Sequence, residues 1–268
     1  MIYLLFLYNP VDFADYLYKT QDFRRAALEY ERIGFLSLSD TLLASYCLLK
    51  AGEALLKTGE PSRAARIYLF GIRNIPAFWE KFTYGLLRAR FAQEDFYAVD
   101  SLAELLQNTD LKWHATIYRS FSLALKGDLD KAKKYLSLLK KTPLRDSALM
   151  LFTKPLKSRN PFLSAGLSFI LPGAGQAYCG RWADAGQSFL ITFLMGGSAL
   201  YYLFFDTTKG STPKGVITGT LAALFWLGNI YGAFNSALDY NDYENRKKEE
   251  ELRNLLECFD LEPEIKRP

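Results

Sequence analysis

The first half of the chain, residues 11–152, alternates apolar and polar positions with the spacing of amphipathic helices. Leu, Ala, Tyr and Phe recur three and four residues apart, and short polar turns interrupt them. This periodicity predicts a succession of helices joined by short connections. We therefore expect an all-α fold in this half of the chain.

Four of the expected helices begin with a similar sequence. In each, an acidic residue is followed four positions later by an alanine, and the four alanines are Ala26, Ala64, Ala98 and Ala132. The steps between them are 38, 34 and 34 residues. Because an acid at a helix start complements the helix dipole, the acids mark four helix N-termini: Asp22, Glu60, Glu94 and Asp128.

Small residues also stand twelve positions before these alanines in three of the four units, at Ala14, Gly52 and Ser120, while Leu86 occupies that position in the third unit. Small residues at two fixed places let paired helices approach closely. This pattern resembles the tetratricopeptide repeat, a helix–turn–helix unit of about 34 residues. The resemblance covers residues 11–144, and it implies a solenoid of helical hairpins with a protein partner on its surface.

Charged residues almost disappear in the second half of the chain. Between residues 160 and 238 the charged residues are Arg181, Asp184, Asp206, Lys209 and Lys214. The apolar runs on either side of residues 207–214 would each form a helix of roughly 30–35 Å, enough to cross a bilayer. We therefore predict a membrane module at 161–241, with the lipid bilayer as partner and transmembrane helices at 185–206 and 215–239.

The segment 161–180 is apolar, but Pro172 and Gly173 divide it into halves too short to cross a bilayer separately. It predicts a kinked or re-entrant segment, and irregular backbone at membrane depth must be covered by other protein. The predicted fold class is thus all-α, with a repeat solenoid followed by a membrane helical hairpin.

Two flanking segments complete the predicted organisation. Residues 153–160 form a basic linker that contains Pro155 and is followed by Pro161. Residues 242–268 are predicted as a charged helical tail facing solvent, with ion pairs four residues apart such as Glu249 with Arg253.

The glycine-rich stretch 170–186 raises the question of catalysis. A phosphate-binding loop would place a lysine after its glycines, and this stretch has none. A nucleophile turn at Ser164 or Ser168 would require a histidine, which the segment lacks. Arg181 and Asp184, three residues apart, are predicted to form a local ion pair.

The same stretch resembles the signature of small bacterial two-span membrane modules, the TM2-like group. The residues that carry this likeness, and that we predict to form a packing motif, are Pro172, Gly173, Gly175, Gln176, Tyr178, Gly180, Arg181 and Asp184. A closing motif follows at Gly228, Asn229, Gly232 and Asn235. The resemblance covers residues 160–242 and implies a bacterial membrane architecture without a settled reaction.

Composition argues against several other functions. His114 is the only histidine, and Cys47, Cys179 and Cys258 lack metal-ligand spacing, so we predict no catalytic residues, metal or cofactor. The net charge of +4 is modest and spread along the chain, which argues against nucleic acid binding.

Asn229, Gly232, Ser236 and Asp239 fall on one stripe of the second predicted span. We favour helix packing over a transport path for this stripe. The leading hypothesis is a non-enzymatic scaffold or adaptor: the repeats bind a partner, and the membrane module anchors the chain and self-associates.

Three alternatives stay open. The first is a component of a transport or channel assembly in which Gln176, Asn229 and Asn235 line a polar path. The second is an accessory factor for envelope assembly or secretion. The third is a membrane enzyme built on Asp184 and Asp239.

The expected location is the bacterial inner membrane. Basic residues flanking the spans favour repeats on the cytoplasmic side. The apolar stretch 1–10 is a candidate remnant of a signal sequence, which would instead place them in the periplasm. Two and three crossings are both open, and labelling of Cys47 and Cys258 is expected to distinguish them.

Overall fold

The computed structural model describes residues 10–259, 261, 265 and 267, and within them every regular element is a helix. The predicted all-helical class is therefore confirmed for this part of the chain. The chain forms two compact units: unit 1 comprises Met1–Lys154 and Leu252–Pro268, and unit 2 comprises Pro155–Glu251. The candidate signal remnant at 1–10 lies, apart from Pro10, outside the described residues.

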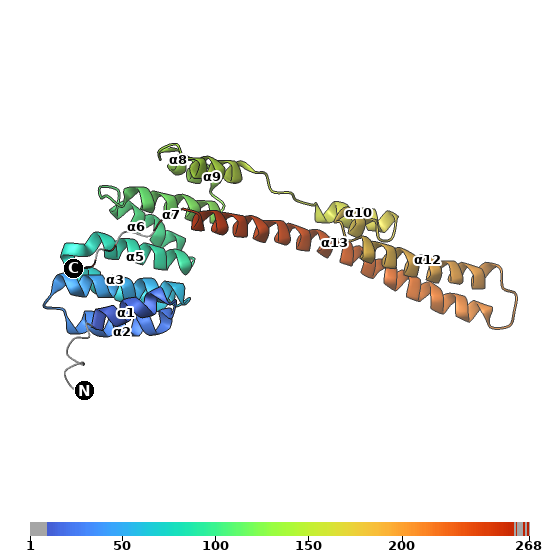
Figure 1. Cartoon of the computed structure of the whole chain (residues 1–268). Helices are drawn as coiled ribbons and strands as arrows, with labels where there is room; N and C mark the ends of the chain where they lie inside the picture. The colour runs from blue at the N-terminus through green and yellow to red at the C-terminus, as the bar shows by residue number, and fades with distance from the viewer. Residues whose placement is uncertain (1–9, 260, 262–264, 266, 268) are drawn as a thin grey trace, which may run out of the picture. The chain divides into compact units, whose positions relative to one another are not determined.

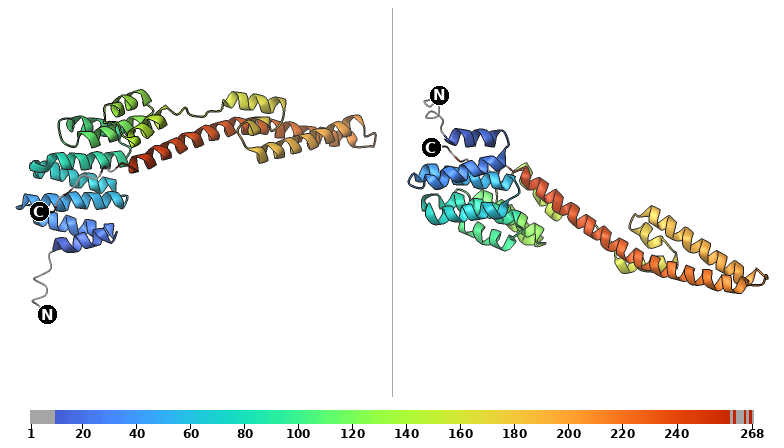
Figure 2. Two further views of the ribbon diagram at one scale, coloured as in Figure 1. Left: turned by 45° about the horizontal axis from the view of Figure 1, so that its top comes forward. Right: turned by 90° about the horizontal axis from the view of Figure 1, so that it is seen from below.

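The helices of unit 1 each pack against the next helix along the chain, and α5 also packs against α3 and α7 (Figures 1 and 2). They are α1 (Pro10–Lys19), α2 (Phe23–Leu36), α3 (Thr41–Lys57), α4 (Pro61–Asn74), the 3₁₀ helix η1 (Pro76–Phe78), α5 (Trp79–Ala92), α6 (Phe96–Leu105), α7 (Lys112–Leu125), α8 (Leu129–Ser137) and α9 (Pro143–Thr153). Contacts in this unit are thus mainly between neighbours in sequence, as in an array of helical hairpins.

The acids at the starts of α2 and α8 cap these helices. The carboxylates of Asp22 and Asp128 accept hydrogen bonds from the backbone N–H groups of Arg25 and Lys131. Glu60 makes no such bond, and α4 instead begins with Pro61, whose missing N–H needs no partner there. The alanines four residues after these acids, Ala26, Ala64 and Ala132, are all fully buried.

In the third unit the prediction is wrong by one residue. Asp95, not Glu94, caps α6, and its carboxylate accepts from the N–H of Ala98. Four residues after Asp95, Val99 is fully buried, whereas Ala98 is half-buried. Glu94 has a positive φ of 61° and lies in the turn before the helix. The turn before α6 has three residues, like the turns before α2, α4 and α8, so Asp95 is the equivalent of Asp22 and Asp128.

Leu86 stands at a place where the other units carry a small residue, but a glycine, Gly85, directly precedes it. A Cβ on Gly52 would lie 2.3 Å from the ring of Tyr68, and a Cβ on Gly85 would lie 2.5 Å from it. These distances are too short for any side chain, so Gly52 of α3 and Gly85 of α5 both make room for Tyr68 of α4. Gly85, one residue before Leu86, is therefore the small residue of the third unit.

The end of the chain also belongs to unit 1, contrary to the picture of a solvated tail over 242–268. Leu252, Leu256, Phe259 and Leu261 are buried in the same core cluster as Phe121. The predicted Glu249–Arg253 pair is replaced by a contact within unit 1: Arg253 Nη2 lies 2.6 Å from Glu94 Oε1. Apolar residues at helical spacing drive this burial despite the charges around them.

Unit 2 contains α10 (Pro161–Ile170), α11 (Ala174–Tyr178), α12 (Trp182–Phe204) and most of α13 (Ser211–Glu257). By length and composition, α12 and α13 are able to cross a membrane. The helix α13 has no boundary near residue 240, where we expected the span to give way to the tail. No glycine or proline occurs between residues 233 and 257, so nothing in the sequence interrupts the helix there.

Candidate functional site

The glycine-rich stretch of unit 2 forms a tight junction between α10, α11 and α12. Gly173 adopts a φ of +88°, and a Cβ there would lie 2.2 Å from the carbonyl oxygen of Ala185. Only glycine meets both demands. The apolar helix α10 ends at Ile170, and the chain turns through Pro172 before α11 begins.

Gly175 lies where α10, α11 and α13 meet. A Cβ on this residue would lie 2.1 Å from the carbonyl oxygen of Ser164 and 2.6 Å from the Cβ of Ala233. The hydroxyl of Ser164 donates to the carbonyl oxygen of Ala233 at 2.7 Å and lies 3.0 Å from that of Gly175. The absent side chain thus brings three helices within hydrogen-bonding distance.

A second set of buried hydrogen bonds joins α11 to α13. The amide nitrogen of Gln176 donates to Asn229 Oδ1 at 2.7 Å, and Gln176 Oε1 accepts from the hydroxyl of Ser168 at 2.9 Å. Gln176 is 4% exposed and Asn229 8% exposed. We call these side chains, with Ser164, the buried polar cluster. The two motifs recognised in the sequence, around Gln176 and around Asn229, meet here.

Arg181 connects α12 to the polar stripe of α13. Its guanidinium lies 2.6 Å from Asp184 Oδ2, so the predicted ion pair is confirmed. It also donates to the hydroxyl of Ser236 and to Asp239 Oδ2, each at 3.3 Å. Together with Asn229, the stripe of α13 therefore faces Gln176 and Arg181.

The remaining predicted residues lie at the margins of this junction. The backbone N–H of Asn160 lies 3.5 Å from the hydroxyl of Tyr178, and Gly180 adopts a positive φ of 81°. Asn235 is half-buried and takes no part in these hydrogen bonds. Gly228 was predicted to be part of the packing motif, but no atom lies within 4 Å of a Cβ added to it.

Gly228 instead borders a hollow of about 550 Å³ between α12 and α13. Its lining is polar near α11, at Gln176, Asp184 and Asn229, and apolar further along the helices. The amide nitrogen of Asn229 is buried without a hydrogen-bond partner. A buried donor of this kind is costly.

The second candidate site lies in unit 1, where the end of the chain returns. We call the described residues of 252–267 the returning segment. Phe259 packs against two aromatic rings of α7, with centroids 5.9 Å from Phe121 and 6.4 Å from Trp113. The side chain is 5% exposed. The core of α7 thus provides an aromatic subsite for the segment.

Further along the segment, α5 and α1 provide polar contacts. The buried hydroxyl of Tyr84 donates to the carbonyl oxygen of Leu261 at 2.6 Å. Arg267 Nη1 lies 2.6 Å from Asp12 Oδ1 and 3.3 Å from Asp15 Oδ2. The segment is therefore held through an aromatic ring, a backbone carbonyl and a guanidinium.

Asp15 is held in place for this contact. Its Oδ1 accepts from the hydroxyls of Tyr30 and Tyr46, so Oδ2 is turned toward Arg267. Burial, and then the hydrogen bond to Asp15, raises the pKa of both tyrosines above the usual range. Both hydroxyls are consequently fixed as donors.

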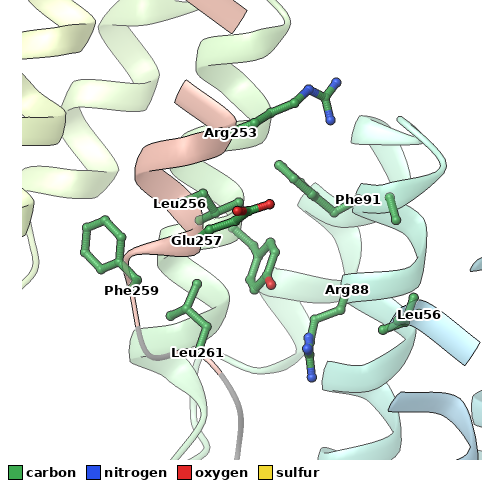
Figure 3. A pocket seen from close by; sticks show the side chains of 10 residues that line it. Leu56, Arg88, Phe91, Arg253, Leu256, Glu257, Phe259 and Leu261 are labelled. Atoms are coloured by element: carbon green, nitrogen blue, oxygen red, sulfur yellow. The ribbon is translucent and has the colours of Figure 1, made fainter. Parts of the chain in front are cut away.

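The returning segment, α3, α5 and α7 together line a hollow of about 420 Å³. Figure 3 shows Arg253, Leu256 and Glu257 of the segment on one side, and Arg88 and Phe91 on the other. The hollow lies beside the core contacts of Leu256, Phe259 and Leu261.

Among the described residues no group of three His, Cys, Asp or Glu side chains gathers as in a metal site. Cys47 is buried, and this burial raises the pKa of its thiol to about 12. A thiol so protonated is a poor nucleophile.

Comparisons with known proteins give no further assignment. No model of a protein family, no curated protein and no solved structure matches this chain.

Sequence reasoning missed the returning segment altogether. Its signal was present, since Leu252, Leu256 and Phe259 lie on one face at helical spacing. The many charged residues around this apolar pattern led us to predict a solvent-exposed tail.

Proposed function

We propose that this protein is a membrane-anchored scaffold, in which α12 and α13 hold unit 2 in a bilayer and unit 1 binds a protein partner. The observation that carries the proposal is the exposure of large apolar side chains along the two helices: Phe193 is 65% exposed, Phe204 73% and Leu224 60%. Such a surface requires an apolar surrounding. Lipid is the surrounding that fits two helices of this length.

The tetratricopeptide resemblance supports the partner-binding half of the proposal. Helical hairpins of similar spacing, with buried alanines at Ala26, Ala64 and Ala132, pack mainly on their neighbours. Repeat arrays of this kind present long surfaces on which peptides and proteins bind.

The two parts of unit 1 favour two crossings over three. Residues before Lys154 and residues after Leu252 share one core, so they lie on the same side of any membrane. The intervening chain then crosses an even number of times. The two long helices account for both crossings, and α10 with α11 packs beside them as a short covered segment.

The buried polar cluster supports packing over transport. Gln176 and Asn229 hydrogen-bond to each other, and Arg181 binds Ser236 and Asp239. These contacts join helices, as polar groups often do in membranes. We therefore place a transport role second, and we propose the cytoplasmic face of a bacterial inner membrane for unit 1 on the basis of the flanking basic residues.

Membrane fractionation tests the anchoring directly. Wild-type chain should remain with membranes after an alkaline carbonate wash. Leu194→Lys combined with Leu224→Lys should release most of it, because both charges would face lipid at several kcal/mol each. Leu36→Lys with Leu138→Lys is the matched control, since these residues are 76% and 71% exposed in unit 1. Wild-type protein in the soluble fraction, or equal release of the control, would contradict the proposal.

A further inference from the structure

The hollow of about 550 Å³ in unit 2 begins where the close approach of α12 and α13 ends. The two helices lie side by side (Figure 1) and touch near the loop that joins them. A Cβ on Gly215 would lie 2.6 Å from the side chain of Leu203, and a Cβ on Gly219 would lie 3.6 Å from that of Ala199. At Gly228, which borders the hollow, an added Cβ meets no atom within 4 Å.

The lining of this hollow changes from polar to apolar along the helices. Asp184 and Asn229 line the end near α11, whereas Ile191, Leu221 and Leu224 line it further toward the loop. Binding pockets for small molecules commonly combine an apolar lining with a few polar groups at fixed places. A hollow with one polar and one apolar end is complementary to an amphipathic molecule.

Several polar groups of the lining have no hydrogen-bond partner among the described residues. The hydroxyls of Ser188 and Thr192 make no hydrogen bond there, whereas those of Ser198 and Thr220, on the same two helices, donate to the carbonyl oxygen four residues earlier. The amide nitrogen of Asn229 is buried without a partner. Because such groups are costly in an apolar surrounding, they indicate a ligand that accepts hydrogen bonds.

The charges at the polar end argue against an anionic ligand. The guanidinium of Arg181 contacts two carboxylates, those of Asp184 and Asp239, which leaves an excess of one negative charge. Asp184 itself lines the hollow, so it would repel a phosphate or carboxylate head. A hydroxyl group can instead donate to this carboxylate and accept from Ser188 or Asn229.

The volume limits the ligand to a single chain. A water molecule occupies about 30 Å³ in the liquid, so the hollow holds roughly eighteen groups of that size, and a methylene group is of similar size. One alkyl chain of about twelve carbons with a glycerol head reaches this number. A lipid with two chains exceeds it.

We infer that the hollow binds a neutral single-chain lipid whose head carries hydroxyl groups, such as a monoacylglycerol. The head lies beside Asp184, Ser188 and Asn229, and the chain runs past Leu221 and Leu224 toward the loop. Unit 2 is then a lipid receptor as well as an anchor. This inference rests on the proposed place of α12 and α13 in a bilayer.

The test uses the full-length protein in phosphatidylcholine nanodiscs and monolauroylglycerol with a photoreactive diazirine in its chain. Irradiated wild type should form adducts on α12 and α13 that unlabelled monolauroylglycerol prevents. Gly228→Leu places a side chain in the hollow and should reduce the labelling at least about tenfold. Gly186→Leu is the matched control, because its Cβ also meets open space but does not border the hollow, and it should label as wild type does.

Two further measurements identify the head. Ser188→Ala removes a hydroxyl that makes no other bond, and should weaken competition by unlabelled monolauroylglycerol about two- to tenfold. Ser198→Ala, whose hydroxyl donates to Leu194, is the control and should change nothing. Lauric acid should compete at least about tenfold more weakly than monolauroylglycerol, since Asp184 repels its carboxylate. Stronger competition by lauric acid or by dodecylamine would overturn the assignment of a neutral head.

The inference is wrong if Gly228→Leu and Gly186→Leu are labelled equally, or if unlabelled monolauroylglycerol prevents no adduct on wild type. It is also wrong if light scattering shows a wild-type dimer that Gly228→Leu converts to a monomer, because a second copy then occupies the hollow. Ser188→Ala decides the matter if Gly228→Leu loses its helical circular dichroism. Protein that does not enter nanodiscs rejects the anchor together with the lipid site, whereas protein that enters without competed labelling rejects the lipid site alone.

Discussion

Units 1 and 2 are both helical, yet they bury opposite kinds of side chain. Unit 1 buries large rings such as Tyr68, Phe82 and Phe121. Unit 2 buries Ser164, Gln176 and other small or polar residues, and it exposes its large apolar ones. Helix content alone therefore says little about the surroundings for which a helix is built.

The difference follows from the solvent, because water and lipid favour the burial of different side chains. In water, apolar rings gain most by burial, so they form the core of unit 1. In lipid, apolar side chains gain little by burial inside the protein. Helices are instead held together by close packing and by hydrogen bonds between them. In the bilayer that we propose for unit 2, Gly175 and the Gln176–Asn229 bond would serve this purpose.

The largest expected effect comes from replacing a phenylalanine by alanine, once in unit 1 and once in unit 2. Phe121→Ala removes a fully buried ring and should lower the free energy of unfolding by about 3–5 kcal/mol. Phe193→Ala removes an exposed ring and should change it by less than about 0.5 kcal/mol. Thermal unfolding followed by circular dichroism in one detergent measures both. Equal losses of stability in the two variants would contradict the difference that we describe between units 1 and 2.

A smaller effect is expected where unit 2 depends on close approach. Gly175→Ala places a methyl group against backbone that has no room to move, and should cost about 1–3 kcal/mol. Gly186→Ala, with open space around its Cβ, should be neutral or stabilise α12 by up to about 1 kcal/mol. The same unfolding measurement applies. A tolerated Gly175→Ala would show that the three helices are not tightly packed there.

A further effect is expected at alkaline pH, and it concerns unit 1. Burial and the hydrogen bond to Asp15 raise the pKa of Tyr30 and Tyr46 in the folded state. Unfolded tyrosine ionises near about pH 10, so the unfolded chain loses these protons first. The free energy of unfolding should be unaffected below about pH 9 and should fall above pH 10, by at most about 1.4 kcal/mol per pH unit for each hydroxyl.

Denaturant unfolding between pH 8 and pH 11 provides the measurement. Tyr30→Phe with Tyr46→Phe should flatten part of the alkaline loss. Tyr16→Phe, at an exposed position, should retain the wild-type slope. If the free energy of unfolding falls equally steeply with pH in all three proteins, the two hydroxyls that donate to Asp15 contribute nothing to the alkaline loss.

Local signals in the sequence predicted much of the fold. The capping acids Asp22 and Asp128, with alanines four residues later, correctly indicate helix starts and buried positions. The register failed at Glu94 because two acids are adjacent there, and the alanine at 98 favoured Glu94 over Asp95. Only the geometry around Tyr68 shows that Gly85 replaces the expected small residue.

Contacts distant in sequence were beyond prediction. Both halves of the buried polar cluster were recognised as motifs, but their meeting through Gln176 and Asn229 depends on how α11 packs on α13. The returning segment combines an apolar stripe with many charges, and composition favoured the charges. Its pairing with Asp12 and Asp15 joins residues from opposite ends of the chain.

We propose that unit 2 is a membrane hairpin and that the chain on both sides of it belongs to unit 1. Labelling with an impermeant maleimide in sealed vesicles tests it at Leu36→Cys, Cys258 and Lys209→Cys, one site at a time. Cys47 and Cys179 are buried and should stay unlabelled. Positions 36 and 258 should label from the same side and position 209 from the other. Labelling of 36 and 258 from opposite sides, or of all three from one side, would contradict the claim.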